Sequence, residues 1–269
     1  MTEPNRLALA GNKVPEPTAT FWIIKVLATT VGETAADLLA TNLHLGTQLT
    51  SIIMAVLFLV VLVVQFRTTR YVPAIYWLTV VLISVVGTLI TDNLTDGLGV
   101  PLAVSTAVFA VALIATFAVW YAVERTLSIH EIVTRRRETF YWLAILFTFA
   151  LGTAAGDFLA EQLNLGYLAS VAVFAGAIAV VAVAHFVFRL GAIISFWIAY
   201  VLTRPLGASL GDFLAQPTSD GGLGLGTIVT SVLFLLAILA LVVFLTVSRR
   251  DRTAVRESSI ASREPSLDL

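Results

Sequence analysis

Four aspartates are the residues of this sequence with the clearest potential for chemistry: Asp37, Asp92, Asp157 and Asp212. Each falls inside a long apolar stretch, where an ionisable side chain costs at least about 2.5–3.5 kcal/mol and usually faces an interior ion or proton pathway. Carboxylates surrounded by hydroxyl and amide oxygens, with no sulfur, suit hard ions such as H⁺, Mg²⁺, Mn²⁺ and Ca²⁺. We therefore expect these four to act as metal or cation ligands.

Further charged residues lie close to the aspartates along the chain. Glu33, Asp96 and Glu161 form a second tier of candidate ligands, and Lys25 and Arg204 are the two basic residues inside apolar stretches. Arg204 and Glu33 differ in expected depth by about 6 Å, which an Arg side chain can span. The sequence predicts that Arg204 approaches an acid of another helix, with Glu33 as the first candidate and Asp37 as the second. The contact would be either a structural lock or a charge that changes partners during transport.

A fourfold internal repeat positions these residues. The pattern [FY]-W-x9-G-x4-D occurs at residues 21–37, 76–92, 141–157 and 196–212, with starts 55, 65 and 55 residues apart. This spacing indicates a duplicated hairpin that was then duplicated again. Because Trp prefers the headgroup level, the glycines should lie about 15 Å deeper and the aspartates about 22 Å deeper. The glycines are expected to let helices approach closely; they are Gly32, Gly87, Gly152 and Gly207.

The elements that carry the repeat are membrane helices. The 269 residues are 58% hydrophobic and 12% charged, with a mean hydropathy of +0.95, which excludes a soluble globular protein. A net charge of −1 argues against nucleic-acid binding, and the lack of cysteine excludes disulfides and thiolate metal sites. Eight stretches are long enough to span a bilayer: Thr18–Leu38, Gln48–Phe66, Val72–Thr91, Val100–Tyr121, Thr139–Phe158, Tyr167–Phe188, Gly191–Leu214 and Thr227–Val247.

The expected fold is an all-α integral membrane protein with eight transmembrane helices, arranged as four parallel-topology hairpin repeats in two duplicated halves. All Lys and Arg except Lys25 and Arg204 fall on one side of the spans, which predicts that both termini are cytoplasmic. The expected organisation is a cytoplasmic N-terminal arm (1–17), a first membrane half (18–122), an amphipathic cytoplasmic linker (123–138), a second membrane half (139–248) and a disordered cytoplasmic tail (249–269).

Several stretches of the sequence carry a resemblance to a known family. They are KVPE at Lys13–Glu16, TTVGETAADLL at Thr29–Leu39, LSIHEIVTRRRE at Leu127–Glu138 and GTAAGDFLAEQLNLGY at Gly152–Tyr167. The chain resembles bacterial multi-pass membrane proteins built from a tandem transmembrane repeat of unknown function, a family of uncharacterised membrane-anchored proteins. The resemblance covers most of Lys13 to Arg250 and implies the repeat architecture and a bacterial inner membrane, but no chemistry.

The function that these residues favour is transport of a small cation. A divalent metal such as manganese or magnesium is the leading candidate, with proton coupling as an option, and a transported cation or proton takes the place of a cofactor. One alternative is a transporter of an organic cation or small metabolite, which would add aromatic walls to the same acids. Another is a structural membrane protein whose aspartates cap short outer helices. We do not expect an enzyme or a nucleic-acid partner; the expected partners are the lipid bilayer and a small cation, and the oligomeric state stays open.

Overall fold

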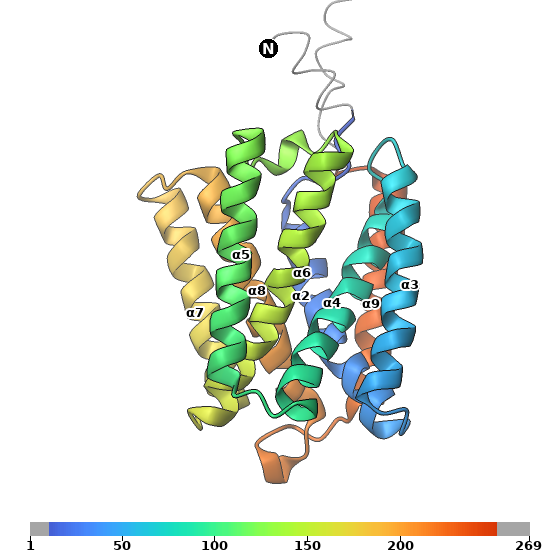
Figure 1. Ribbon diagram of the computed structural model, residues 1–269, viewed down its shortest axis with the longest axis vertical. Helices are drawn as coiled ribbons and strands as arrows, with labels where there is room; N and C mark the ends of the chain where they lie inside the picture. The colour runs from blue at the N-terminus through green and yellow to red at the C-terminus, as the bar shows by residue number, and fades with distance from the viewer. Residues whose placement is uncertain (1–10, 252–269) are drawn as a thin grey trace, which may run out of the picture.

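The computed structural model describes residues 11–251, which fold into a bundle of eight long helices with no strand in that range (Figure 1). The helices are α2 (Ala19–Asp37), α3 (Thr47–Arg67), α4 (Pro73–Asp92), α5 (Leu102–Glu124), α6 (Arg135–Asp157), α7 (Tyr167–Phe186), α8 (Ala192–Ala215) and α9 (Thr227–Ser248). Seven are long and apolar enough to cross a membrane. The eighth is α2, which contains Lys25, Glu33 and Asp37. The predicted all-α fold of eight helices is therefore confirmed.

The helix boundaries lie close to those expected from hydropathy, and the largest shift is at the linker. Helix α6 begins at Arg135 because the hydroxyl of Thr134 caps it by accepting a hydrogen bond from the Arg137 amide. Together with the extension of α5 to Glu124, this leaves residues 125–134 between the two helices, with a short 3-10 turn at Ile129–Glu131. Ile129 and Ile132 of the linker are buried, so its apolar side chains pack against the protein.

Four inner helices form a closed ring. Helix α2 packs against α4, α4 against α6, α6 against α8, and α8 against α2. The other helix of each repeat packs outside this ring, against the inner helix of the next repeat: α3 on α4, α5 on α6, α7 on α8, and α9 on α2. The two helices of each predicted hairpin are thus joined by a loop, but the outer helix packs mainly against the inner helix of the next repeat. This arrangement interlocks the four repeats.

The inner and outer helices differ in what their surfaces contact. Most of the surface of α3, α5, α7 and α9 is exposed and apolar. By contrast, more than half of the residues in the most apolar part of α4, α6 and α8 are buried. An apolar outer surface of this extent is what contact with lipid requires. The polar and charged residues inside the spans are therefore concentrated on the axis of the inner ring.

The repeated glycines are the contact points of the inner ring. A Cβ atom at each glycine would clash with a side chain on the next inner helix, so the predicted close approach is present. In every case, the contacted residue stands three positions before the next repeat's glycine. The pairs are Gly32 with Ser84, Gly87 with Phe149, Gly152 with Arg204, and Gly207 with Thr29.

The aromatic pair that opens each repeat closes one end of the ring. The first aromatic residue of each pair packs against the tryptophan of the next repeat, with ring centroids 5.5–6.1 Å apart: Phe21 on Trp77, Tyr76 on Trp142, Tyr141 on Trp197, and Phe196 on Trp22. Trp77, Trp142 and Trp197 are buried. The neighbouring repeat therefore covers these three side chains, and their depth at the headgroup level stays a prediction.

Both ends of the described chain lie at this aromatic end of the bundle, which we call the terminal end (Figure 1). Residues 12–15 are buried there, and Lys13 Nζ bonds to Glu138 Oε2 at 2.6 Å and to the Phe66 carbonyl at 3.2 Å. The Tyr71 hydroxyl donates to Asp251 at 2.6 Å. Part of the predicted arm is thus an ordered strap across this end, and the predicted disordered tail lies outside the described residues from 252 onward.

Candidate cation site

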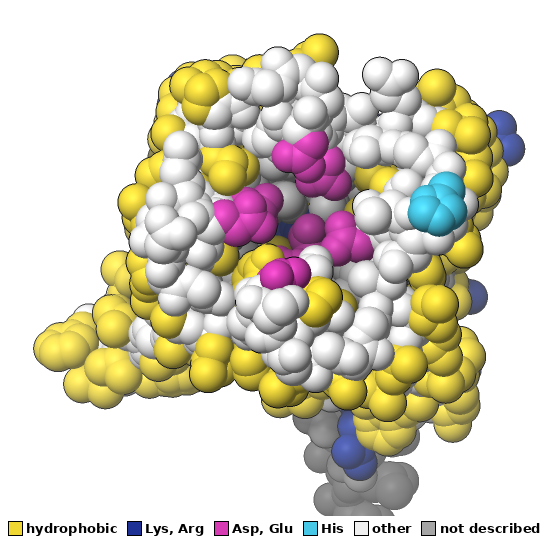
Figure 2. Space-filling model, turned by 90° about the horizontal axis from the view of Figure 1, so that it is seen from below, with side chains coloured by type: hydrophobic (Ala, Val, Ile, Leu, Met, Phe, Trp, Pro, Cys, Tyr) yellow, Lys and Arg dark blue, Asp and Glu magenta, His cyan; other side chains and the backbone are white. Residues whose placement is uncertain are grey.

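The end of the bundle opposite the terminal end has an acidic cavity on its axis, which we call the acidic end. Figure 2 shows acidic side chains gathered around this hollow, whose volume is about 150 Å³. Every acidic residue proposed from the sequence lines it: Glu33, Asp37, Asp92, Asp96, Asp157, Glu161 and Asp212. The repeat therefore brings acids from all four inner helices to one space.

Local structure explains why the aspartates face this space. Asp37, Asp92 and Asp157 are the last residues of their α-helices, and each is followed by a wider π-helical turn: Leu38–Asn42, Asn93–Gly97 and Phe158–Gln162. The chain remains helical through each aspartate, and none of the three makes a capping hydrogen bond. The alternative in which these aspartates cap short outer helices is wrong, because the helix continues where a cap would require it to begin.

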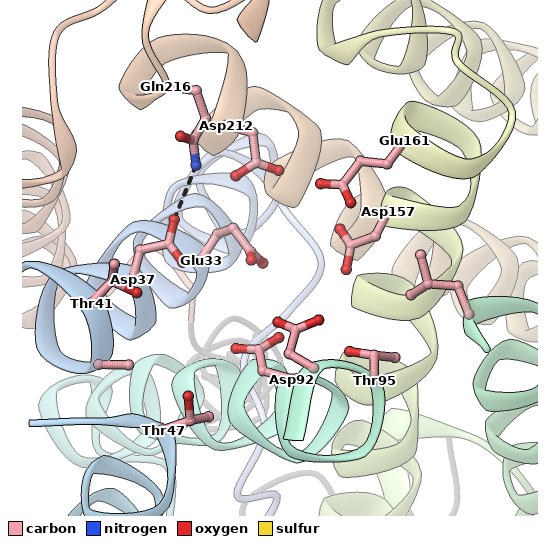
Figure 3. Close-up of a pocket in the computed structure, with 13 residues that line it drawn as sticks. Glu33, Asp37, Thr41, Thr47, Asp92, Thr95, Asp157, Glu161, Asp212 and Gln216 are labelled. Atoms are coloured by element: carbon pink, nitrogen blue, oxygen red, sulfur yellow. Dashed lines mark hydrogen bonds between the residues drawn. The ribbon is translucent and has the colours of Figure 1, made fainter. Parts of the chain in front are cut away.

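The fourth repeat differs at this position. Helix α8 continues past Asp212 to Ala215, and Gln216 then takes an extended conformation. The Gln216 side chain turns back and donates to Asp37 Oδ2 at 3.2 Å (Figure 3). This hydrogen bond links the fourth repeat to the first at the wall of the cavity, where the ring of four repeats closes.

The remaining aspartates have no such partner. Among residues 11–251, no hydrogen bond or ion pair reaches the carboxylates of Asp92, Asp157 or Asp212, although Figure 3 shows them directed toward a common space. Asp212 is only 9% exposed. Buried carboxylates are normally paired or hydrogen-bonded, so this arrangement leaves carboxyl groups available to a cation from outside the chain.

The acids do not form a preassembled metal centre. In the described part of the chain, no group of three or more His, Asp or Glu side chains is placed to hold one metal ion. The four aspartates expected to be metal ligands share the cavity wall, but they do not converge on one point. Such a wall can attract a cation that keeps part of its water shell, as Mg²⁺ does in most protein sites.

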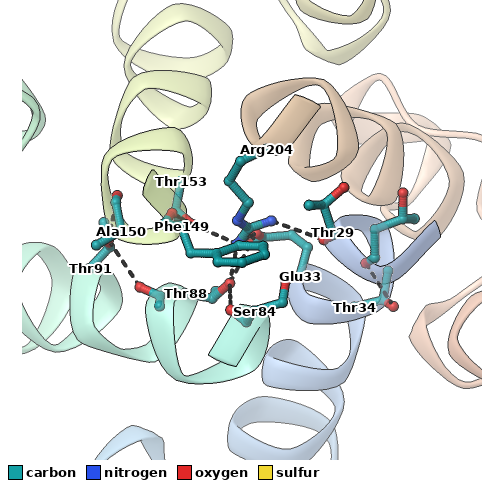
Figure 4. Close-up of polar contacts among 12 residues, drawn as sticks. Thr29, Glu33, Thr34, Ser84, Thr88, Thr91, Phe149, Ala150, Thr153 and Arg204 are labelled. Carbon is teal, nitrogen blue, oxygen red and sulfur yellow. Dashed lines mark hydrogen bonds and ion pairs between the residues drawn. The ribbon is translucent and has the colours of Figure 1, made fainter. Parts of the chain in front are cut away.

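Arg204 pairs with Glu33, which lines the cavity, as the sequence predicted. Arg204 Nη2 donates to Glu33 Oε2 at 2.9 Å, to Thr153 Oγ1 at 2.6 Å and to Thr88 Oγ1, and Nη1 donates to the Thr29 carbonyl at 2.9 Å (Figure 4). Arg204 is fully buried. The guanidinium therefore joins all four inner helices through one layer of contacts.

Two residues of this layer were missed by the analysis of charged residues. Thr88 and Thr153 follow the glycines of the second and third repeats, in the same register as Glu33 after Gly32. Their hydroxyls accept from the same nitrogen as the Glu33 carboxylate. The register of the repeat is the signal that could have identified them, because residues in one register share one depth.

Lys25 lies on the other side of this layer and does not line the cavity. In the repeat register, it stands four residues before Thr29, one helical turn closer to the terminal end than the Arg204 position. Its ammonium is buried, has no hydrogen-bond partner among the described residues, and lies 4.4 Å from the Phe149 ring centroid and 4.2 Å from that of Tyr200. Cation–π contact is the interaction that this position offers.

The axis is closed between Lys25 and the terminal end. The hydroxyls of Tyr76 and Tyr141 meet at 2.5 Å, and both side chains are completely buried. Both tyrosines belong to the circle of packed aromatic side chains described above. The structure therefore has a cavity open at the acidic end and packed side chains across the rest of the axis.

A comparison with known proteins identifies the repeat but no activity. A family model described as a repeat of unknown function (DUF347) matches residues 20–71, 75–126, 140–190 and 195–251. Each match covers one inner helix and the outer helix that follows it. The chain belongs to the family built from this repeat. No curated protein and no solved structure matches the chain.

Proposed function

We propose that this chain of four repeats transports a small inorganic cation across a membrane. The observation that carries the proposal is the acidic cavity, in which Asp92, Asp157 and Asp212 have no hydrogen-bond or ion-pair partner among residues 11–251. Intramembrane acids that face a cavity are typical of ion and proton pathways. The packed axis beneath the cavity corresponds to a state in which the pathway is closed toward the terminal end.

The lining of the cavity supports an inorganic substrate. Its lining residues are acids, threonines, Gln216, Ala40 and Leu102, with no aromatic residue among them. An organic cation transporter would be expected to add aromatic faces around the acids, so the lining favours a hard ion bound through oxygen. Manganese and magnesium remain candidate substrates, since a partly hydrated divalent ion needs only one or two direct carboxylates.

The distribution of basic residues supports an orientation. In the described chain, every Lys and Arg except Lys25 and Arg204 lies at the terminal end. The positive-inside rule favours a cytoplasmic location for that end, so we propose a bacterial inner-membrane protein with both termini inside. The acidic cavity then opens away from the cytoplasm, where its charge would gather external cations.

Transport is favoured over the other roles for two reasons. A structural role gives no reason to retain several unpaired carboxylates in one cavity, because like charges held together destabilise a fold. Catalysis would require distinct roles for the acids, whereas the repeat supplies equivalent ones.

The experiment is cation flux into proteoliposomes that contain the purified full-length chain. We expect wild-type vesicles to take up at least one of Mn²⁺, Mg²⁺, Na⁺ or K⁺ faster than protein-free vesicles, and Asp212→Asn to lower that flux about tenfold by removing a charge from the pathway. The matched control is Asp220→Asn, since Asp220 lies at the same end but is exposed and outside the cavity lining. Absence of flux for every cation, or equal effects of both substitutions, would contradict the proposal.

A further inference from the structure

We propose that the three oxygens around Arg204 Nη2 form a binding site for one monovalent inorganic cation, which exchanges with the Arg204 guanidinium. These oxygens, Glu33 Oε2, Thr88 Oγ1 and Thr153 Oγ1, are called the oxygen cage below. The inference rests on the proposed transport function, because the acidic cavity is the route by which a cation reaches the cage.

The geometry of the cage is that of a single-ion site. Oxygens from α2, α4 and α6 converge on one nitrogen atom, two of them at 2.9 and 2.6 Å. Carboxylate and hydroxyl oxygens are the ligands that hard cations prefer. In the fourth repeat, Ala208 takes the corresponding position and provides no oxygen. Three repeats thus supply the oxygen ligands. The fourth repeat supplies the guanidinium of Arg204, which is the cation bound by these oxygens.

The cage is accessible from the cavity through Glu33. Glu33, whose carboxylate pairs with Arg204, also lines the cavity, so a cation in the cavity meets this residue without crossing the aromatic end. An Arg204 side chain that leaves the cage toward the cavity would meet the carboxyl groups of Asp92 and Asp212, which line that cavity together with Glu33. Neither carboxyl group has a hydrogen-bond or ion-pair partner in the described chain.

A proline inside helix α8 favours this movement of the Arg204 side chain. Pro205 stands inside the helix directly after Arg204. It has no N–H group to bond the carbonyl one turn earlier, which weakens the helix at that point. The Nε atom of Arg204 is buried without a hydrogen-bond partner among the described residues, so the Nη atoms make all the hydrogen bonds of this side chain there. Exchange at the cage would release most of these contacts at once.

The charge of the cage selects a monovalent ion. Its one carboxylate is neutralised by the one positive charge of Arg204, and a monovalent cation would replace that charge without changing the total. A divalent ion would leave an uncompensated positive charge in a buried layer. The cage therefore takes a monovalent ion, whichever cations the wider cavity attracts.

The test uses thermal melting of purified full-length protein in detergent, with Arg204→Met to empty the cage. At equal ionic strength, we expect Na⁺, K⁺ or Li⁺ to raise the Tm of this variant by about 4 °C relative to N-methylglucamine, since a ligand that binds only the native state stabilises it. Mg²⁺ and Mn²⁺ should have a smaller effect. The Glu33→Gln/Arg204→Met double variant should lose the response.

The matched control is Lys25→Met, which removes the other buried cation of the axis but leaves the cage filled. It should show no cation-specific rise in Tm. The inference is overturned if Arg204→Met responds only to guanidinium, responds equally to divalent ions, or does not respond. A response that persists in the double variant also overturns it.

A second variant covers the case in which Arg204→Met does not fold. Arg204→Lys keeps the charge but presents a point charge in place of the planar fork, so a monovalent ion should compete with it more effectively. We expect radiolabelled Na⁺ or Rb⁺ to bind this variant with about tenfold higher affinity than wild type, and addition of Thr153→Val to weaken binding. Equal or undetectable binding to both proteins would overturn the cage.

The two proposals can fail separately. Loss of cation flux from vesicles with cation binding at the cage intact would reject transport alone. Flux that depends on Asp212 in a protein whose Arg204 variants bind no monovalent cation would reject the cage alone.

Discussion

The two ends of the bundle are built from the same repeat, yet they treat charge in opposite ways. At the terminal end, Glu138 is buried and accepts from both Lys13 at 2.6 Å and Gln65 at 3.1 Å. At the acidic end, Asp157 and Asp212 line a cavity with no partner among residues 11–251. Paired charges stabilise one end, while the unpaired carboxyl groups at the other end carry a cost that a bound cation or a proton relieves.

The other charged groups follow the same division. At the terminal end, Glu124 pairs with Arg136 and Arg137, and His130 contacts Glu16 at 2.9 Å. At the acidic end, the one hydrogen bond to a repeated aspartate side chain in the described residues comes from a neutral amide, that of Gln216. We infer that the paired charges at the terminal end stabilise the fold, whereas the unpaired carboxyl groups at the acidic end destabilise it.

The largest effect on stability is expected from breaking the buried pair at the terminal end. Lys13→Met leaves Glu138 buried with only an amide donor, and loss of one partner of a buried ion pair costs about 3–5 kcal/mol. The measurement is the unfolding free energy of the purified chain. The comparison between the two ends breaks down if Asp157→Asn, which removes a charge without a partner, is equally destabilising.

A smaller loss is expected in the layer that joins the two ends. Gly87→Ala places a methyl group against the backbone and Cβ of Phe149 on α6, and such overpacking costs about 1–3 kcal/mol. The control is Gly176→Ala in α7, where nothing lies within 4 Å; Ala there should stabilise the helix by about 0.5–1 kcal/mol. Equal shifts of Tm for both variants would show that the inner helices are not in tight contact.

The smallest effect is a pH dependence at the terminal end. The hydrogen bond to Glu16 raises the pKa of His130 above its usual 6.5, against a smaller opposing effect of burial. Because the pKa is raised in the folded state, the contact stabilises the protein fully below pH 6.5 and ceases to do so as the pH rises through the folded-state value. Solvent screening reduces the stabilisation that this contact provides, since the His130 side chain is 44% exposed.

The measurement is the difference in Tm between wild type and His130→Gln. It should be positive below pH 6.5 and shrink at higher pH. A difference that grows with pH would mean that the Glu16 contact does not favour the protonated ring.

Sequence periodicity predicted the helices, the shared depth of the four aspartates and the contact between Arg204 and Glu33. It did not predict that α3 covers α4 and that α9 covers α2, because lipid and protein are equally apolar neighbours for a hydrophobic face. For the same reason, it did not predict that Phe21 of the preceding repeat packs against Trp77, which is buried.

The behaviour of the aspartates at the helix ends was also beyond the sequence pattern. An aspartate near the end of a predicted helix suits both a cap and a continuing helix, and the π-helical turn that follows Asp92 decides between them. The role of Thr88 and Thr153 depended on which side chain would occupy the axis. Only the packing of Arg204 against Gly152 determines that.

The most direct test of the central claim measures flux and stability together for Asp37→Asn, Asp92→Asn, Asp157→Asn and Asp212→Asn. Each substitution removes charge but keeps size and hydrogen-bonding capacity. If the acidic end is a cation pathway, each variant should lose cation flux into proteoliposomes by about tenfold while its Tm stays unchanged or rises, and Asp220→Asn should retain both. Unchanged flux in all four variants, or flux lost only where Tm falls, would contradict the claim.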